Sequence, residues 1–376
     1  MSIYLDNAAA TQVCPEAVQA ALDAMTLHYG NPSSTHAAGR EAAKRLEQAR
    51  AQVSHALGCR SDELVFTSGG SESDNWAIKC GAAYQSRFGR HIISSRAEHA
   101  AVLRSLEHLE SRGFEVTFLN PRSDGSVAVS DVVSALRPDT CLVSVMLVNN
   151  ETGAVTDVPE IAKAVRAANP KTLIHTDAVQ AFLKLPFSAS SLGADLITVS
   201  GHKVHAPKGI GALYIRSGLH LPPLIHGGGQ ELGRRSGTEP LPLIAAFGAA
   251  CAAAETTLEQ DLRRMKALRS RAAERLCKEN EMLKVVGGGA PHILSVSLPG
   301  WRSEVLMNFL EAEGICVSKS SACKRGGRSH VLEAMGLGAP VIDGALRISF
   351  SRFTTEAEVD SFCAALTAAR IRLRHR

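Results

Sequence analysis

ADLITVSGHK, residues 194–203, is the stretch of sequence that decides the fold. Its uninterrupted apolar run at 196–199 is typical of a strand that is buried on both faces, as in a parallel sheet. Small and basic residues follow at once and end the strand in a turn. The same succession of a short apolar run and a polar turn recurs along the middle of the chain. Further strands are predicted at 64–67, 91–93, 115–119, 141–145, 173–175 and 212–215.

Helical patterns lie between several of these strands. Residues 40–57 place alanine, leucine and valine on one stripe, and Gly58 stops the pattern. A second helix is predicted at 158–168. Alternation of strands and helices predicts an α/β fold with a mostly parallel, seven-stranded sheet flanked by helices.

The pattern changes after residue 255. A long charged helix at 257–280 leads to strand candidates at 293–298 and 346–350, with helices near 304–313 and 355–370. This mixture predicts a second, smaller α+β domain. We assign residues 13–255 to a large domain, and residues 1–12 and 256–376 to the small one. The small domain carries a cysteine-containing loop at about 318–329.

The composition excludes several classes of protein. The 376 residues are 45% hydrophobic and 21% charged, which excludes disorder, collagen and coiled coil. A net charge of +4, from 41 basic and 37 acidic residues, does not indicate a nucleic-acid partner. No apolar stretch is long enough to cross a membrane and the N-terminus does not resemble a secretory leader, so a cytoplasmic protein is expected. Nine scattered cysteines without a CxxC pair indicate neither a disulfide framework nor a zinc site.

The turn TSGGSES at 67–73 follows one predicted strand and precedes a helix near 75–83. Ligands of open α/β sheets bind beyond the carboxyl ends of the strands. Two glycines and several hydroxyls at a helix N-terminus suit an anion, especially a phosphate. A simple capped turn, with Ser71 as the N-cap, is the alternative.

Two charged residues follow other strands of the predicted sheet. Asp177 ends an apolar run, where a carboxylate is costly unless a cation pairs with it. A cationic ring nitrogen of a ligand suits that role, and a capping or structural ion-pair role is the alternative. Lys203 stands beside Gly201 and His202. A lysine close to other cations becomes a usable amine for a Schiff base, whereas an ordinary surface lysine is the alternative.

The loop SKSSACKRGGR at 318–328 is small, polar and glycine-rich, as exposed mobile loops are. Cys323 lies beside three cations there, a setting that favours the nucleophilic thiolate. An incidental surface thiol is the alternative interpretation. An anion cup, an amine and a buried carboxylate, each placed after a strand, together predict pyridoxal 5'-phosphate (PLP) as the cofactor.

An ordered set of short motifs spans nearly the whole chain. It comprises YLDNAA (4–9), GNPSS (30–34), FTSG (66–69), EH (98–99), VNNETG (148–153), DAVQ (177–180), SGHK (200–203), HGGGQE (226–231), RSGT (235–238), SAC (321–323) and RISF (347–350). In these motifs the chain resembles the cysteine desulfurases of the NifS/IscS type, class V aminotransferase-like enzymes of PLP fold type I. The resemblance implies that fold, a homodimer with shared active sites, and removal of sulfur from L-cysteine to give L-alanine.

The resemblance also implies a role for each matching residue. Lys203 is expected to hold PLP covalently, His99 to stack on its ring and assist proton transfer, and Cys323 to act as the nucleophile. The other cofactor contacts expected are Asp177 at the pyridine nitrogen, Gln180 at the phenolic oxygen, Gly70, Ser71, Ser200 and His202 at the phosphate, Asn150, and Thr238 at the phosphate of the neighbouring subunit. The substrate carboxylate is expected at Arg347, Asn31 and Asn150, because a guanidinium suits bidentate binding. No metal site is expected.

The resemblance implies a persulfide on Cys323 that passes to a sulfur-acceptor protein, for iron–sulfur cluster assembly or for thiolation of tRNA or a cofactor. The sequence does not identify this acceptor. The basic residues near Cys323 lead to the hypothesis that they select an acidic acceptor surface. These residues are Lys319, Lys324, Arg325 and Arg328.

Three other interpretations stay open. A selenocysteine lyase, or another PLP-dependent β-elimination enzyme, would share both fold and cofactor. A non-catalytic interaction protein would share the fold alone. A hydrolase that used the HGGG run at 226–229 as an oxyanion hole would need a GxSxG nucleophile elbow, and the sequence has none.

Overall fold

The computed structural model describes residues 2–319 and 327–373. Its larger sheet has seven strands in the order β2-β8-β7-β6-β5-β3-β4. They are β2 (Leu64–Thr67), β3 (His91–Ser95), β4 (Glu115–Leu119), β5 (Thr140–Ser144), β6 (Leu173–Asp177), β7 (Leu196–Ser200) and β8 (Gly211–Ile215). Neighbours are parallel except at β8, which is antiparallel to both β2 and β7. The predicted α/β fold with a mostly parallel, seven-stranded sheet is confirmed.

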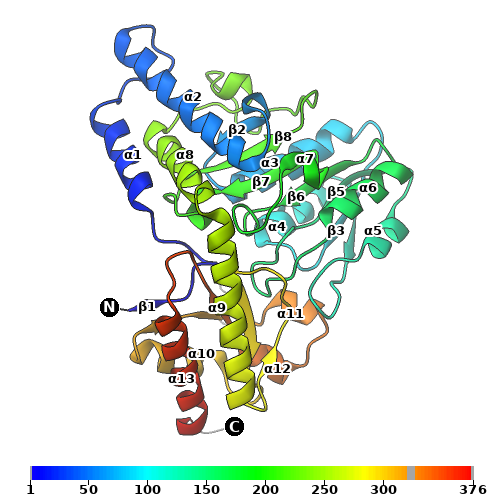
Figure 1. Cartoon of the computed structure of the whole chain (residues 1–376). Helices are drawn as coiled ribbons and strands as arrows, with labels where there is room; N and C mark the ends of the chain where they lie inside the picture. The colour runs from blue at the N-terminus through cyan, green and yellow to red at the C-terminus, as the bar shows by residue number, and fades with distance from the viewer. Residues whose placement is uncertain (1, 320–326, 374–376) are drawn as a thin grey trace.

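Helices flank this sheet (Figure 1). They are α1 (Pro15–Thr26), α2 (Ala37–Leu57), α3 (Gly70–Gln85), α4 (Ala100–Glu110), α5 (Val129–Ala135), α6 (Val158–Ala168), α7 (Ala189–Leu192) and α8 (Leu241–Glu255), with short 3-10 turns η1 (Ser61–Glu63), η2 (Gly201–Lys203) and η3 (Glu231–Gly233). Helix α3 packs against β5, β6, β7 and β8, which places its N-terminus at the middle of the sheet. Helices α1 and α2 both pack against α8.

The rest of the chain forms a smaller α+β part, which occupies the lower half of Figure 1. Its sheet has the order β12-β13-β10-β9, and β1 pairs in parallel with β11. The elements are β1 (Ile3–Tyr4), α9 (Leu258–Glu279), β9 (Lys284–Val285), β10 (Ile293–Ser297), α10 (Ser303–Ala312), β11 (Ile315–Cys316), β12 (Ser318–Lys319), α11 (His330–Ala334), α12 (Ala339–Asp343), β13 (Ala345–Ser349) and α13 (Glu356–Arg372). Leu5 packs in the apolar core of this part, whereas Ala8 packs in the core around the large sheet. The domain boundaries themselves stay a prediction.

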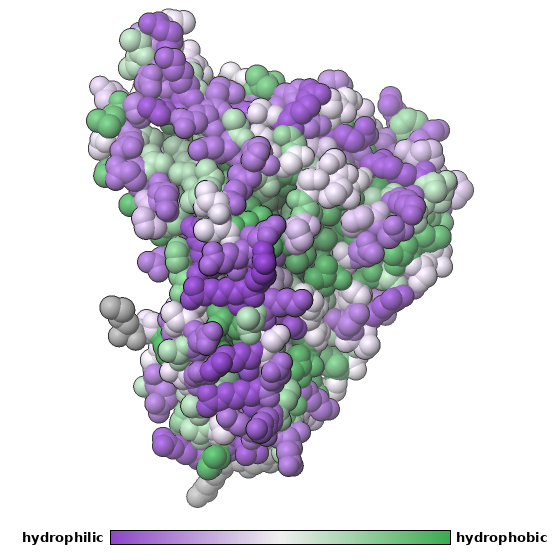
Figure 2. Space-filling model, viewed as in Figure 1, coloured by the Kyte–Doolittle hydropathy of each residue, from purple (hydrophilic) through white to green (hydrophobic). Residues whose placement is uncertain are grey.

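Helix α9 is amphipathic. It buries Met265, Leu268, Ala272 and Leu276, and the face that it turns to the viewer is hydrophilic (Figure 2). Taken alone, no helix within residues 2–319 or 327–373 is long and apolar enough to span a membrane, although α8 and α9, with a bend of 77° between them, pass the same test as a pair.

The start of α3 excludes the alternative in which Ser71 is the N-cap of a simple capped turn. The helix begins at Gly70, and Gly69 is the N-cap with φ +148° and no side-chain cap. Glycine adopts such a φ without steric penalty. A Cβ added to Gly70 would lie 2.8 Å from Cγ2 of Val179. The close approach of Val179 to Gly70 therefore sets the start of this helix. No local pattern reveals this contact, because the two residues lie far apart in the sequence.

A buried ion pair fixes η3, and with it the loop at 225–240, to the large sheet. The side chains of Arg50 and Glu231 are 6% and 3% exposed, and two hydrogen bonds of 2.9 and 2.7 Å join them. Glu231 also accepts from the backbone N–H of Phe66 at 2.8 Å. Either charge alone would be uncompensated in an apolar setting, so each partner needs the other.

We predict that Arg50→Ala lowers the free energy of unfolding by about 3–5 kcal/mol, because it leaves Glu231 buried without its cation. Urea denaturation followed by circular dichroism measures this difference. Arg60→Ala removes the exposed arginine that pairs with Asp62 and serves as the control, with little expected change. Equal effects of the two substitutions would contradict the assigned role of the buried pair.

Candidate active site

A cavity of ≈ 520 Å³ opens where the strands of the large sheet end. It is lined by residues from the turns after β2, β3, β5, β6 and β7, and by β13 of the smaller part. The structure brings nine of the predicted site residues together here: Gly70, Ser71, His99, Asn150, Asp177, Gln180, His202, Lys203 and Arg347. Their convergence follows from the parallel strands, whose carboxyl ends meet at one edge of the sheet.

Four predicted residues do not line this cavity. Ser200 is buried, and its Oγ lies 2.7 Å from Nδ1 of His202. Asn31 and Thr238 are exposed on the surface of the chain. Cys323 lies outside the described residues.

Asp177 is the last residue of β6 and is buried. Its Oδ1 accepts from the backbone N–H of Val179 at 2.9 Å. Burial raises the pKa of this carboxyl group, and the nearby His99 and Lys203 partly oppose that effect. A cation brought into the cavity beside Asp177 would stabilise the ionised carboxylate.

A layer of buried titratable groups surrounds Asp177, and the sequence reasoning missed two of its members, Asp74 and His175. Burial, followed by the charge of Asp177, raises the pKa of Asp74 well above its usual value. Oδ1 of Asp74 lies 3.7 Å from Nε2 of His175. Burial also lowers the pKa of His175 to about 3, so this ring is neutral at physiological pH and the contact is not an ion pair. The signal in the sequence was that Asp74 shares one helix face with Ala77, Ile78 and Gly81, which are buried.

Glu98 belongs to the same layer. Its Oε1 accepts from Oγ of Ser95 at 2.8 Å and from the backbone N–H of Met146 at 3.0 Å. Its Oε2 has no hydrogen-bond partner among the described residues. Burial raises the pKa of Glu98 to about 8, so the carboxyl group is mostly protonated at neutral pH.

Lys203 ends the 3-10 turn η2, directly after β7. Its Nζ donates to the backbone oxygens of Ala8 and Ala9 at 2.6 and 2.7 Å. Nε2 of Gln180 donates to the same Ala8 oxygen at 2.9 Å. The N-terminal segment is therefore part of the cavity wall, although the sequence offered no role for these alanines.

His202 and His99 both line the cavity. Burial, followed by the positive charges of Lys203 and Lys208, lowers the pKa of His202 to about 4. His99 is the N-cap of α4, and its Nδ1 accepts from the backbone N–H of Ala101 at 3.2 Å. A neutral His99 ring with an accepting Nδ1 carries its proton on Nε2.

The N-terminus of α3 forms an anion cup. Gly70 and Ser71 contribute the first backbone N–H groups of a helix of 16 residues, and such groups carry partial positive charge. Glu72, in the same turn, accepts from Ser68 N at 2.8 Å and from Arg235 at 2.9 and 3.1 Å. Burial raises the pKa of Glu72, but the hydrogen bonds from Arg235 and Ser68 outweigh it, and the net shift is downward. Arg235 therefore neutralises Glu72, the acidic residue in the first turn of α3.

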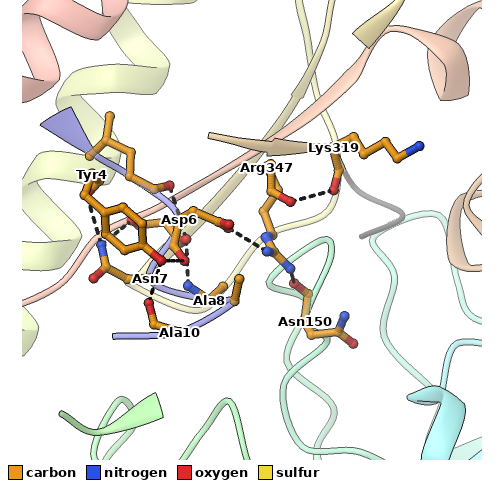
Figure 3. A network of polar contacts seen from close by, with 12 residues as sticks. Tyr4, Asp6, Asn7, Ala8, Ala10, Asn150, Lys319 and Arg347 are labelled. Carbon is orange, nitrogen blue, oxygen red and sulfur yellow. Dashed lines mark hydrogen bonds and ion pairs between the residues drawn. The ribbon is translucent and has the colours of Figure 1, made fainter. Parts of the chain in front are cut away.

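Arg347, on β13, is 2% exposed. Its guanidinium donates to the backbone oxygen of Asn150 and to Oδ1 of Asp6, each at 2.8 Å. Figure 3 shows the guanidinium between these two residues. Nε of Arg347 is buried and has no hydrogen-bond partner among the described residues. Two partners therefore fix the guanidinium of Arg347 beside the cavity that this residue lines.

The basic residues near Cys323 are less available than the sequence implied. Nζ of Lys319 lies 3.3 Å from Oε1 of Glu304, and Arg328 makes two hydrogen bonds of 2.7 and 2.8 Å with Asp343. Two of the four proposed cations are thus already paired within the chain, while Lys324 and Arg325 lie outside the described residues. The hypothesis of an acidic acceptor surface stays untested.

We predict that Glu98→Gln removes a pH dependence of stability. The pKa of Glu98 rises from 4.5 to about 8 on folding. The stability that protonated Glu98 contributes to the folded state is therefore complete at low pH and is lost as the pH rises toward 8. The free energy of unfolding falls by no more than about 1.4 kcal/mol per pH unit over this range. Glutamine cannot ionise, so the free energy of unfolding of the variant should gain on that of the wild type between pH 5 and pH 8. Urea denaturation across this range measures the difference, and parallel curves would contradict it.

Comparisons with known proteins agree with this geometry. The family model described as aminotransferase class-V matches residues 3–362. A protein of Trichormus variabilis named cysteine desulfurase 2 is 44% identical over 363 residues, which cover 95% of this chain and 90% of the relative.

Solved structures give the same relationship. One named NifS-like protein has a TM-score of 0.94 and 38% identity, covering 99% of this chain and all of its own. A structure of SspA in complex with cysteine has a TM-score of 0.80 and 33% identity, covering 94% of this chain and all of its own. Together, the match along nearly the whole chain and the convergence of the predicted residues in one cavity show that the chain belongs to the aminotransferase class-V family, in its cysteine desulfurase group.

Proposed function

We propose that this chain is a PLP-dependent cysteine desulfurase, which takes sulfur from L-cysteine, releases L-alanine and retains the sulfur as a persulfide on Cys323. The observation that carries this proposal is the cavity in which Asp177, Lys203 and the N-terminus of α3 converge. SspA, solved with cysteine bound, supports L-cysteine as the substrate.

The residues of the cavity fit PLP in three respects. The buried carboxylate of Asp177 needs a cationic partner, which a protonated pyridine nitrogen supplies. The amine of Lys203 suits an aldehyde, and the cup at Gly70 and Ser71 suits a phosphate. When bound, PLP supplies an electron sink that weakens bonds around the substrate α-carbon.

The remaining cofactor contacts follow the sequence expectations. Ser200 and His202 join the phosphate cup, and Gln180 provides an amide for the phenolic oxygen. His99 would lie against the bound cofactor and would move a proton at Nε2. Thr238 completes the phosphate contacts of the neighbouring subunit.

The substrate is held by its carboxylate. Arg347 lines the cavity, and a guanidinium binds carboxylates through charge-assisted hydrogen bonds. Asn150, whose backbone oxygen already fixes Arg347, also lines the cavity. Asn31 is exposed in the single chain, and its predicted role in substrate binding requires a further rearrangement or a second subunit.

Sulfur transfer is a displacement at the substrate sulfur. Nζ of Lys203 takes the substrate α-proton. The thiolate of Cys323 then forms an S–S bond as the C–S bond of L-cysteine breaks, so thiol and L-cysteine become persulfide and L-alanine without an external oxidant. A sulfur-acceptor protein receives the terminal sulfur, for iron–sulfur cluster assembly or thiolation.

A homodimer is part of the proposal. Helix α1 exposes Val18, Leu22 and Met25, at 54%, 47% and 56%, and their spacing places them on one face of the helix. Exposed apolar stripes of this kind mark protein–protein interfaces. A second copy of this chain is the partner that covers this face of α1, because the family resemblance implies active sites that are shared between two subunits. Cytoplasmic location stays a prediction.

We predict that Cys323→Ala retains the yellow colour of bound PLP but loses at least about 100-fold of L-cysteine-dependent sulfide release under reductant. Sulfide, L-alanine and the visible spectrum are measured on the same samples. Cys277→Ala, which removes an exposed cysteine on α9, is the matched control and should behave as wild type.

Other outcomes separate the remaining interpretations. Equal sulfide release from wild type and Cys323→Ala would indicate a lyase, for which selenocysteine is the first substrate to test. Absence of cofactor absorbance from every variant, after incubation with PLP, would indicate a non-catalytic protein on this fold.

A further inference from the structure

The segment at residues 4–10, called the N-terminal strap below, is fixed firmly to the end of β13. The backbone N–H of Leu5 donates to Cys316 O at 2.9 Å, and the backbone oxygen of Leu5 accepts from Ser349 N at 2.7 Å. Nδ2 of Asn7 donates to Ser349 O at 2.9 Å, and the backbone N–H of Ala8 donates to Oγ of Ser349 at 2.8 Å. The main chain of the strap therefore has a single defined position.

Hydrogen bonds also join residues within the N-terminal strap. The hydroxyl group of Tyr4 donates to the backbone oxygens of Asp6 and Ala10, at 3.2 and 2.9 Å, and Figure 3 shows the phenol ring beside these residues. The backbone N–H of Ala9 donates to Asp6 O at 3.0 Å. These bonds hold the Cα of Asp6, so its carboxylate has little freedom to move away from Arg347.

We infer that Asp6 is a positioning residue for the substrate carboxylate, acting through Arg347; this inference rests on the function proposed above. Oδ1 of Asp6 lies 2.8 Å from Nη2 of Arg347, while the side chains of Asp6 and Arg347 are 21% and 2% exposed. A guanidinium has five N–H donors. Asp6 and Asn150 engage Nη2 and Nη1, and Nε–H has no partner among the described residues.

Two physical effects give Asp6 this role. An arginine this buried needs a compensating anion, and Asp6 supplies one when no substrate is bound. The ion pair also fixes the plane of the guanidinium at the wall of the cavity that Arg347 lines. Because the strap is held at both ends, Asp6 orients Arg347 and does not compete with the incoming carboxylate.

The N-terminal strap also contacts Lys203. Two and three residues beyond Asp6, the oxygens of Ala8 and Ala9 accept from Nζ of Lys203. One short segment thus contacts both the lysine that would hold the cofactor and, through Asp6, the arginine that would bind the substrate carboxylate. The spacing between the cofactor and this arginine is what distinguishes an α-amino acid from a simple amine.

The test compares two ligands that differ by the carboxylate alone. L-alanine and ethylamine are titrated into PLP-loaded wild type and Asp6→Asn, with binding followed by cofactor absorbance and by calorimetry. We expect Asp6→Asn to weaken L-alanine binding by about 10-fold, through loss of a charge-assisted contact, and to leave ethylamine binding unchanged. The KM for L-cysteine should rise by a similar factor, whereas kcat should stay within about threefold.

Two further variants act as controls. Asp360→Asn removes an aspartate that pairs with Arg271 through hydrogen bonds of 2.9 and 2.7 Å, between α13 and α9, and should change neither ligand affinity. Asp6→Glu keeps the charge and should bind L-alanine more tightly than Asp6→Asn. Thermal melts establish that each variant is folded, and Asp6→Glu keeps the test decisive if Asp6→Asn does not fold.

Three results would overturn the inference. Equal weakening of L-alanine and ethylamine would mean that Asp6 acts on the fold or on Lys203. Unchanged L-alanine binding would mean that Arg347 is positioned without Asp6, and tighter binding would mean that Asp6 competes with substrate. Failure of the proposed function is a separate result, because a chain that binds L-alanine through Asp6 and Arg347 yet forms no persulfide is not a desulfurase.

Discussion

The rest of the site depends on a carboxylate buried at the end of a parallel strand. Asp177 loses its hydration inside the sheet, and burial raises its pKa. A cation in the cavity compensates that cost. The fold therefore contains a buried carboxylate that is unfavourable by itself and that a cationic ligand stabilises. Three neighbouring buried residues increase the cost of ionising Asp177. They exclude water and add no fixed positive charge behind it; they are Asp74, His175 and Glu98. Stability and ligand binding are thereby coupled in one layer of residues.

A second constraint is the joining of distant parts of the chain at one cavity. Arg347 comes from the smaller sheet, Lys203 from the large sheet, and the N-terminal strap contacts both. Arg235 and Glu231 tie the loop at 225–240 to α3 and β2 in the same manner, through carboxylates that are largely buried. Three of these contacts, Asp6–Arg347, Arg50–Glu231 and Glu72–Arg235, pair opposite charges with little water access, where geometry is held more tightly than at an exposed surface.

Much of the fold and of the site could be predicted from local pattern. Apolar runs located all seven strands of the large sheet to within about two residues, the usual uncertainty of element ends. Asp177, Lys203 and the turn at Gly70 were found because each follows such a run. The two-residue strands β1, β9, β11 and β12 were not predicted, because so short a strand has no periodicity. The start of α3 was misplaced, since the nearest side chain, Val179, lies far away in sequence.

The sequence by itself determined the order of strands and helices, the chemistry placed after each strand and, through its motifs, the family. These properties are local, because period, turn residues and motif letters are read within a few positions. Only the tertiary structure decided that Asp6 pairs with Arg347, that Ala8 and Ala9 hold Lys203, and that Glu98 and Asp74 lie buried beside Asp177. Such contacts join residues far apart in the chain, and their energies depend on burial, which one stretch of sequence does not specify.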